Sequence, residues 1–262
     1  MSPIKVVVHG AAGRMGQEIT NGLCRELGVQ VVGAVDVKAD KDNMPLPTGG
    51  AVPFSTNLQT ILDLTHPNVV VDFSLAKATV PAVRVATGKG INVVVGTTGL
   101  SVGDIEEIRK QAEAHKTGVV VAPNFALGAV LMIHLSKIVA KYMDYVEIIE
   151  LHHHQKADSP SGTALSTAKA MVQSRGKPFS RAVGQGPAVS RGQEEGGVTL
   201  HSVRLPGLMA HQEVLFGASG QTLSIRHDTI NRECYLPGII IAVKEVGKHQ
   251  GLVYGLDSLL NL

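Results

Sequence analysis

Short apolar runs alternate with helical patterns along the first half of the chain. Five of these runs have the length and continuous apolar character of strands buried on both faces: residues 4–8, 29–35, 69–73, 91–95 and 119–121. Helical patterns lie between them, at residues 15–25, 57–63, 78–87 and 103–115. This order predicts an α/β fold with a doubly wound parallel sheet. The polar stretch 38–50 is predicted to be a loop.

The pattern changes after Asn124, where the alternation of strands and helices stops. A helical pattern covers residues 127–141, and the strand-like segment YVEIIELHHH follows it. The segments GVTLHSVRLPG and AHQEVLFGASGQTLSIRHDT alternate residue types around Gly turns, which predicts antiparallel strands and hairpins. We therefore expect a second, smaller α+β domain with a mixed or antiparallel sheet.

Two further stretches set the expected domain boundaries. Residues 175–197 are rich in Gly, Gln and charged residues and predict an exposed, mobile loop. The segment GIIIAVKEVGK is a helical pattern with a Gly stop, and we expect it to return to the first domain. The predicted domains are residues 1–123 with 232–262, and residues 124–231.

Composition excludes several classes of protein. The 262 residues are 44% hydrophobic and 18% charged, which indicates an ordinary soluble globular protein. Aromatic residues make up only 3% and the net charge is +2, so we expect no nucleic-acid partner. No apolar run approaches membrane-spanning length, so we expect no membrane association. Cys24 and Cys234 form no CxxC pair, and we expect reduced thiols in a cytoplasmic protein.

The segment VVVHGAAGRMGQEI places Gly10, Gly13 and Gly16 between a predicted strand and a predicted helix. Small residues there let the backbone approach a pyrophosphate, and the helix N-terminus offers free N–H groups. Asp36 ends the second strand, at the distance along the chain expected of a ribose-binding acid. Together these residues predict a Rossmann-like dinucleotide site. The alternative is a tight turn in which Asp36 only caps a loop.

The choice of dinucleotide depends on Asp36 and Lys38. A carboxylate favours NAD because it repels the extra phosphate of NADP, whereas Lys38 offsets that repulsion, so we expect use of NADH, NADPH or both. Two more turns, VVVGTTG with residues 96–99 and VVVAPNF with residues 122–125, lie at carboxyl ends of predicted strands, where open α/β sheets bind ligands. Both are candidates to contact the nicotinamide ribose; otherwise each is only a strand-to-helix connection.

The segment LHHHQKADSPSGTA concentrates three histidines, a lysine and an aspartate ahead of a predicted helix. We expect Ser159 to be the N-cap and Pro160 the first helical residue. The amides of Ser161, Gly162 and Thr163 would then be free, and the Thr163 hydroxyl would add a donor. These groups form a candidate site for a carboxylate.

Three interpretations suit the histidines. Strand alternation puts His152 and His154 on one face and His153 on the other if the strand continues, so one metal ion could hold all three only if the strand bends. We therefore expect no metal. A solvated polar turn is the second interpretation. The third, which we favour, is a cationic pocket in which a histidine donates a proton near neutral pH and Lys156 supplies a fixed positive charge.

Several motifs, in this order, resemble one known family. EIIELHHHQKADSPSGTA closely resembles the E-L-H-H-x-x-K-x-D-(A/S)-P-S-G-T-A signature of the dihydrodipicolinate reductase family. The segments GAAGRMG, VDFS, VVGTTG, APNF and IRHDTINRECYLPGI extend the resemblance over the whole chain. The resemblance implies NAD(P)H-dependent reduction of a small dicarboxylate, the cyclic unsaturated imine formed from 4-hydroxy-tetrahydrodipicolinate, on the diaminopimelate route to lysine. It also implies a homotetramer.

The same resemblance assigns roles to individual residues. His152 matches the family's catalytic proton donor, Lys156 its second catalytic cation and His153 a substrate contact, while Gly162 and Thr163 match its carboxylate site. The family's cofactor contacts match a further set of positions: Gly10, Ala11, Ala12, Gly13, Arg14, Met15, Asp36, Gly96, Thr97, Thr98, Ala122, Pro123, Asn124 and Phe125. The first domain is then the dinucleotide-binding domain, and the second the substrate-binding and oligomerisation domain.

The chemistry of these residues agrees with the resemblance. Hydride addition to an unsaturated imine develops negative charge on the ring, so a nearby acid and a fixed cation lower the barrier. We expect Asp158 to brace the loop, and Arg204, Arg226, His227 and Arg232 to be mainly structural. Two alternatives stay open: another two-domain NAD(P) dehydrogenase acting on an amino-acid-derived acid, and a nucleotide-sensing protein without catalysis.

Overall fold

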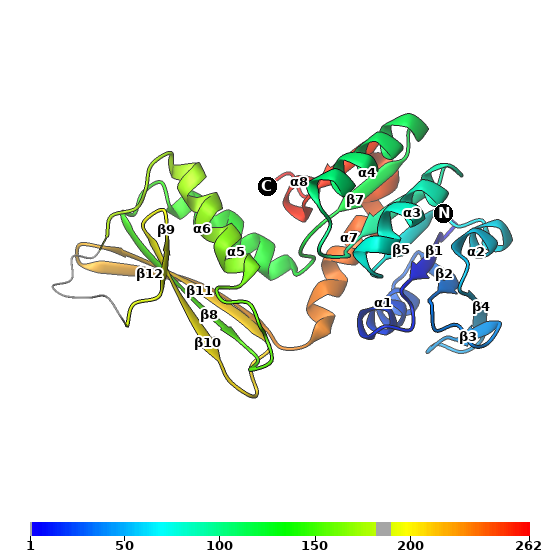
Figure 1. Ribbon diagram of the computed structural model, residues 1–262, viewed down its shortest axis with the longest axis horizontal. Coiled ribbons are helices and arrows are strands. Elements are labelled where there is room, and N and C mark those ends of the chain that lie inside the picture. Colours follow the sequence, from blue (N-terminus) through cyan, green and yellow to red (C-terminus); the bar gives the residue numbers. More distant parts are fainter. Residues whose placement is uncertain (1, 182–189) are drawn as a thin grey trace. The chain divides into compact units, whose positions relative to one another are not determined.

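The structure is a computed structural model that describes residues 2–181 and 190–262 (Figure 1). The chain divides into two compact units. Unit 1 comprises Met1–Leu127 and Arg232–Leu262, and unit 2 comprises Gly128–Asn231. The C-terminal helical segment therefore belongs to unit 1, together with the first half of the chain.

Unit 1 contains an eight-stranded sheet in the order β13-β7-β6-β5-β1-β2-β4-β3. Its strands are β1 (Ile4–His9), β2 (Val29–Val35), β3 (Asn43–Pro45), β4 (Ala51–Ser55), β5 (Val69–Asp72), β6 (Asn92–Val95), β7 (Gly118–Val121) and β13 (Gly251–Tyr254). Neighbouring strands are parallel, except that β3 runs antiparallel to β4. The predicted parallel sheet is confirmed, and its predicted strands are β1, β2, β5, β6 and β7.

Helices cover this sheet in two layers (Figure 1). The first layer holds α2 (Leu58–Thr65), α3 (Ala76–Thr87) and α4 (Val102–His115), and the second holds α1 (Arg14–Arg25) next to α7 (Leu236–Glu245). Three short helices complete the unit: η1 (Arg232–Tyr235), η2 (Val246–Lys248) and α8 (Leu256–Leu259). Because strand side chains alternate, Val7 and Val95 pack with the first layer, whereas Val6 and Val8 are buried on the other side.

Three short strands, β3, β4 and β13, lie where the pattern predicts none. β3 falls within the predicted loop 38–50, so that prediction is wrong for Asn43–Pro45, which forms a hairpin with β4. In its turn, the Leu46 N–H donates to the Gly50 carbonyl at 3.0 Å. At the opposite edge, β13 pairs with β7. These strands are three to five residues long and contain Pro or Gly, so they show neither a period nor a continuous apolar run, and only the neighbouring strand reveals them.

Unit 2 contains a five-stranded sheet in the order β12-β11-β8-β10-β9. Its strands are β8 (Tyr145–His152), β9 (Gln193–Glu195), β10 (Val198–Arg204), β11 (Ala210–Ala218) and β12 (Gln221–Thr229). The β11–β12 hairpin is antiparallel as predicted, and β10 is antiparallel to β9 but parallel to β8, so the sheet is mixed, one of the two arrangements expected. The reason for the parallel pairing is α6 (Gly162–Arg175), a helical crossover that returns the chain in the direction of β8.

One face of the unit 2 sheet packs against α6 and α5 (Leu127–Val139) (Figure 1). Val146 and Ile148 of β8 point into this core, where they join Phe216 of β11 and Met171 of α6. Strand alternation places Glu150 next in the same row, and its side chain is fully buried. The apolar row of β8 therefore ends in a carboxylate.

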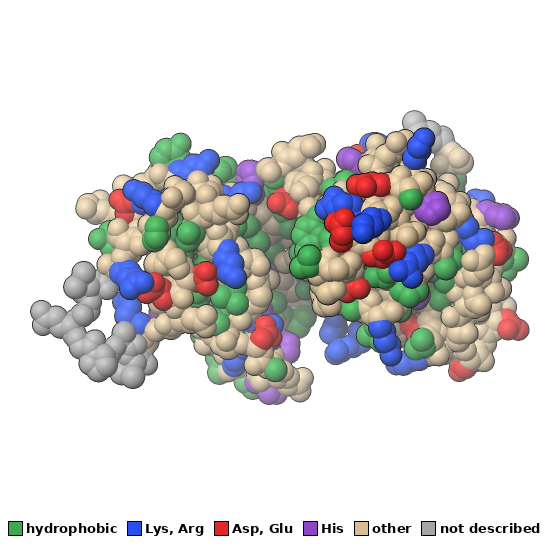
Figure 2. Space-filling view, turned by 45° about the horizontal axis from the view of Figure 1, so that its top comes forward, with side chains coloured by type: hydrophobic (Ala, Val, Ile, Leu, Met, Phe, Trp, Pro, Cys, Tyr) green, Lys and Arg blue, Asp and Glu red, His purple; other side chains and the backbone are tan. Residues whose placement is uncertain are grey.

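Part of the predicted loop 175–197 lies outside the described residues, namely residues 182–189. Further along, the loop prediction is wrong, because Gln193–Glu195 form β9 and pair with β10 through a turn at Gly196 and Gly197. In the described part of the chain, no helix is long and apolar enough to cross a membrane. On the face shown in Figure 2, basic and acidic side chains are interspersed, in keeping with the net charge of +2.

Candidate active site

The glycine loop follows β1 and is tightly packed. Gly10 has a φ of +86°, and a Cβ added to it would lie 2.6 Å from the Phe73 carbonyl oxygen. A Cβ on Gly16 would lie 2.0 Å from the Gly10 carbonyl oxygen. Gly13 is the N-cap of α1, so no side chain occupies the start of this helix. The N-terminal amides of α1 therefore have no capping side chain in front of them, which suits the binding of a phosphate.

Asp36 holds the glycine loop from the end of β2. Its Oδ2 accepts a hydrogen bond from the Ala12 N–H at 2.9 Å, and its Oδ1 accepts one from the Lys38 N–H at 2.9 Å. The side chain is largely buried. Asp36 therefore caps the loop, which was the alternative interpretation of the sequence. Ribose binding by Asp36 stays a prediction, and its place at the end of β2 is compatible with it.

The predicted cofactor residues meet at one edge of the unit 1 sheet. They follow the carboxyl ends of β1, β2, β6 and β7, and the chain's strand order reverses between β1 and β5. Such a reversal point is where open α/β sheets bind their ligands. The topology therefore brings the predicted glycine loop, Asp36 with Lys38, and the turns at 96–98 and 122–125 to the same edge.

The two turns after β6 and β7 are shaped by aromatic packing. A Cβ on Gly96 would lie 2.1 Å from the Phe73 ring, so only glycine fits there without displacing the ring. Phe73 and Phe125 have ring centroids 5.7 Å apart at an angle of 47°. Asn124 accepts a hydrogen bond from the Ala126 N–H at 2.9 Å, which orders the second turn. Thr98 and Pro123 are exposed at the surface of these turns.

A buried acid beneath these turns was missed from the sequence. Asp72 ends β5, and its carboxylate accepts hydrogen bonds from Ser74 Oγ at 2.6 Å, Thr79 Oγ1 at 2.6 Å and Thr97 Oγ1 at 3.1 Å. The acid thereby links the end of β5, the start of α3 and the turn after β6. The only signal in the sequence was the VDFS motif, in which an acid directly follows an apolar run.

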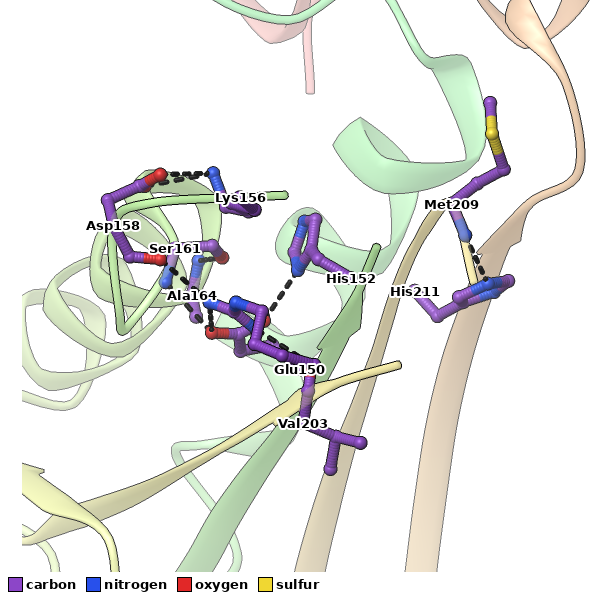
Figure 3. Close-up of polar contacts among 10 residues, drawn as sticks. Glu150, His152, Lys156, Asp158, Ser161, Ala164, Val203, Met209 and His211 are labelled. Atoms are coloured by element: carbon purple, nitrogen blue, oxygen red, sulfur yellow. Dashed lines mark hydrogen bonds and ion pairs between the residues drawn. The ribbon is translucent and has the colours of Figure 1, made fainter. Parts of the chain in front are cut away.

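In unit 2, His152 is the last residue of β8 and contacts a buried carboxylate (Figure 3). Its Nδ1 lies 2.5 Å from the Oε2 of Glu150, whose side chain is fully buried. Arg204 of β10 binds the same carboxylate in a bidentate manner, with Nη1 to Oε2 at 2.7 Å and Nη2 to Oε1 at 2.8 Å. Glu150 therefore links His152, the candidate proton donor, to Arg204 and to the core of the sheet. Arg204 has a structural role here, as predicted.

The start of α6 differs from the prediction. Ser161, not Ser159, is the N-cap, and its hydroxyl accepts the Ala164 N–H at 3.1 Å. Pro160 lies ahead of the helix, after a cis peptide bond, and is buried. The prediction was wrong because the segment offers two capping serines, and only Ser161 has its amide anchored, by a hydrogen bond to Glu150 Oε1 at 3.1 Å.

The candidate carboxylate site is correspondingly smaller than predicted. The Ser161 amide is engaged by Glu150, so it is not free. The amides of Gly162 and Thr163 lie in the first turn of α6, where a helix leaves N–H groups without intrahelical partners. A Cβ on Gly162 would meet nothing within 4 Å, so a ligand can approach this turn closely. We call the two amides, with the Thr163 hydroxyl, the α6 anion site.

The remaining cationic groups lie in the loop between β8 and α6. The strand ends at His152, so His153 and His154 do not continue its alternation, and both are exposed. Lys156 is partly buried, and its Nζ binds Asp158 at 2.7 and 2.9 Å. This pair lowers the pKa of Asp158 and agrees with the loop-bracing role predicted for it. Among the described residues, no group of His, Cys, Asp and Glu side chains has the arrangement of a metal site.

The charges around His152 act in opposite directions. Burial lowers the pKa of His152, Glu150 raises it, and the nearby charges of Lys156 and Arg204 lower it; the net pKa lies below the ordinary value. Burial raises the pKa of Glu150, but hydrogen bonds from Arg204, Ser202 and His152 outweigh burial and lower it to about 2. Glu150 is therefore a carboxylate at neutral pH and can only accept hydrogen bonds from the ring.

Two family models match the chain. The model for the N-terminus of dihydrodipicolinate reductase matches residues 4–125, and the model for its C-terminus matches residues 128–260. The 4-hydroxy-tetrahydrodipicolinate reductases of Dehalococcoides mccartyi and Bacillus subtilis are 52% and 42% identical to the chain; the alignments cover 100% and 98% of both sequences, respectively.

Solved structures agree with these matches. A dipicolinate-bound dihydrodipicolinate reductase from a Paenisporosarcina species has a TM-score of 0.87 and 35% identity, with 97% of this chain and 98% of that chain covered. An amine dehydrogenase from Mycobacterium smegmatis has a TM-score of 0.68 at 18% identity, over 98% of this chain and 96% of that chain. The second likeness indicates a shared fold only.

Proposed function

The chain belongs to the dihydrodipicolinate reductase family, and on that premise we propose that it reduces the imine derived from 4-hydroxy-tetrahydrodipicolinate with His152 as proton donor and Lys156 as second catalytic cation. Family membership makes the chain an oxidoreductase of lysine and diaminopimelate biosynthesis. The observation that carries the proposed roles is the His152–Glu150 contact beside the start of α6.

Unit 1 has the features required to hold a nicotinamide dinucleotide. Its glycine loop leaves no room for side chains at Gly10 and Gly16, and the start of α1 is free of a capping side chain. We assign the pyrophosphate to residues 10–15, the adenosine ribose to Asp36 with Lys38, and the nicotinamide ribose to the turns after β6 and β7. We expect both NADH and NADPH to bind. The nicotinamide supplies the hydride when it is bound.

The α6 anion site is assigned to one carboxylate of the substrate. Gly162 and Thr163 direct amides outward from the positive end of a helix, which favours an anion. His153 is exposed in the loop between β8 and α6 and is assigned as a further contact. The dipicolinate held by the Paenisporosarcina relative is a planar dicarboxylate, which supports a dicarboxylate substrate here.

The proton is assigned to the Nε2 atom of His152. Because Glu150 engages Nδ1, Nε2 is the ring nitrogen left to donate to the substrate. Hydride addition develops negative charge on the ring of the substrate, and a proton from His152 neutralises it. Lys156 supplies a positive charge near the start of α6. This positive charge stabilises the negative charge on the substrate before the proton arrives.

The test is the loss of nicotinamide absorbance when purified protein meets freshly prepared condensation product of pyruvate and aspartate semialdehyde. We expect rapid oxidation of NADH and NADPH, and a loss of roughly two or more orders of magnitude in turnover for His152→Gln. Cofactor affinity in this variant should stay close to that of the wild type. Tight NADH binding without oxidation by a competent substrate would favour another dehydrogenase or a nucleotide sensor instead.

We also propose that the protein is a homotetramer assembled through unit 2. The sheet of this unit packs against α5 and α6 on one face, while Ile149 and Leu151 of β8 and Leu215 of β11 alternate to the other face and stay partly exposed. A second subunit would cover these apolar side chains. Light scattering coupled to size-exclusion chromatography measures the mass directly, and a monomer at micromolar concentration would refute the assembly.

A further inference from the structure

We propose that Glu150, held in place by Arg204, is a positioning residue that fixes the orientation and tautomer of His152 and anchors the α6 anion site through the same carboxylate. The inference rests on the catalytic role proposed for His152. Glu150 is proposed to act through its two neighbours, His152 and Ser161, and not by contacting the substrate or the cofactor.

The two oxygens of Glu150 have separate tasks. Oε2 lies 2.5 Å from His152 Nδ1, and Oε1 accepts the Ser161 N–H at 3.1 Å (Figure 3). Ser161 is the N-cap of α6, directly before the amides of Gly162 and Thr163. One carboxylate therefore fixes both the ring that donates the proton and the helix turn that binds the substrate anion.

Arg204 makes the burial of this carboxylate favourable. An unpaired carboxylate in a protein core is strongly destabilising, whereas a bidentate guanidinium supplies two charge-assisted hydrogen bonds in a fixed plane. Arg204 gives these bonds at 2.7 and 2.8 Å, and its Nη2 also donates to the Asp158 carbonyl at 2.8 Å. The arginine thus orients Glu150 and also fixes the loop that carries Lys156.

The carboxylate determines which ring nitrogen carries the proton in neutral His152. An ionised carboxylate has no proton to donate, so the short contact requires a proton on Nδ1. After His152 gives up its Nε2 proton, the Nδ1–H tautomer remains and can be reprotonated at Nε2. Without Glu150, the ring could rotate or take the other tautomer, and the proton would be misplaced.

Charges from three elements act on the ring. Glu150 of β8 favours the imidazolium form, while Lys156 of the loop and Arg204 of β10 oppose it. Removing the negative charge of Glu150 leaves only the opposing cations and the effect of burial. The pKa of His152 must then fall further below its ordinary value, and a smaller fraction of the enzyme carries the proton at neutral pH.

The kinetic test compares Glu150→Gln with His152→Gln and the double variant. We expect Glu150→Gln to lower kcat by roughly 10- to 100-fold and to move the high-pH decline of kcat to lower pH, because the acid must be protonated to act. In the His152→Gln background, Glu150→Gln should lower kcat by less than about 2-fold, since the residue acts through the ring. Equal fold losses in both backgrounds, or an unshifted pH profile, would refute the proposal.

Asp144→Asn is the matched control. It also removes the carboxylate partner of a largely buried arginine, Arg175, but at the opposite ends of β8 and α6 from His152. We expect this variant to lose stability without a change in the pH profile of kcat. If the pH profile of kcat shifted as much in Asp144→Asn as in Glu150→Gln, the effect of Glu150→Gln would reflect a general loss of stability.

A measurement on the wild-type protein does not depend on turnover and uses a variant only to assign a signal. Long-range nitrogen–proton correlation spectra of the histidine rings report the tautomer, and His152→Gln assigns the signal. We expect neutral His152 to carry its proton on Nδ1. A proton on Nε2 would overturn the positioning role even in an active enzyme, whereas an Nδ1 proton without turnover would count against the proposed reaction alone.

Discussion

His9 Nδ1 lies 2.8 Å from the Oδ1 of Asp72, and the aspartate side chain is fully buried. The two residues end the adjacent parallel strands β1 and β5, one residue before Gly10 and Phe73. The contact therefore connects the start of the glycine loop to the acid that already holds the turns after β5 and β6. Asp72 therefore connects three segments of the candidate cofactor edge, those that follow β1, β5 and β6.

Asp72→Asn should weaken both the fold of unit 1 and the binding of NADH. The amide cannot accept all of the hydrogen bonds that converge on the carboxylate, which should cost about 1 to 3 kcal/mol of unfolding free energy. Urea unfolding followed by circular dichroism measures the loss, and NADH fluorescence titration measures the affinity. Unchanged NADH affinity in a destabilised variant would separate Asp72 from the cofactor edge.

The same variant should change the acid stability of the protein. Burial raises the pKa of Asp72, but hydrogen bonds from His9, Ser74 and Thr79 outweigh burial, and the pKa lies below its ordinary value. A group with a lowered pKa in the folded state stabilises the protein above its unfolded pKa, about 3.9, and this contribution is lost as the pH falls toward the folded pKa. Asp72→Asn should therefore flatten the fall in stability over the pH range below about 4.

The sequence predicts the frame of this protein better than its buried polar contacts. Continuous apolar runs and the glycine spacing identify β1, β2 and the loop at Gly10, because period and spacing are local properties. Glu150 could not be identified in the same way, because its partner Arg204 is distant in the chain and meets it only through the parallel pairing of β8 with β10. The error at Ser159 has the same origin, since the anchor of the helix start is Glu150.

Gly16→Ala should abolish dinucleotide binding. An added Cβ would lie 2.0 Å from the Gly10 carbonyl oxygen and 2.7 Å from the Ala11 Cα, so backbone atoms of the loop must move. Gly103→Ala, in the first turn of α4, is the control, because its Cβ would approach only the Ser101 hydroxyl, at 3.7 Å. We expect calorimetric titration with NADH to show no binding for the first variant and wild-type affinity for the second.

Lys38→Ala should alter the preference between cofactors. The Lys38 amide donates a hydrogen bond to Asp36, and its side chain is exposed. We expect this side chain to contact the extra phosphate of NADPH. Loss of its charge should raise the KM for NADPH by roughly 10-fold and leave the KM for NADH within about 2-fold, given about 1.4 kcal/mol for one exposed phosphate contact. Equal KM changes for both cofactors would remove Lys38 from the discrimination.

Thr163→Val should chiefly raise the KM for the dicarboxylate substrate. The hydroxyl of Thr163 is part of the α6 anion site, and valine keeps the branched shape while it removes the donor. Loss of one hydrogen bond to a charged group should raise KM by roughly 10-fold or more, with kcat changed far less. Ser166→Ala, on the exposed side of α6, is the control. Thr167→Val is unsuitable, because the Thr167 hydroxyl accepts a hydrogen bond from buried Gln212. A KM unchanged in Thr163→Val would refute the assignment of the hydroxyl.

Lys156→Ala should lower turnover by roughly two orders of magnitude without weakening NADH binding. The ammonium group is partly buried and held by Asp158, so its charge is placed near the start of α6 in a defined position. Asp158→Asn separates the charge from its placement, because it keeps the lysine and removes the ion pair. We expect Asp158→Asn to lose less turnover than Lys156→Ala, since a mobile ammonium group still reaches the substrate. If the two variants lost turnover equally, the lysine would act by bracing the loop and not through its charge on the substrate.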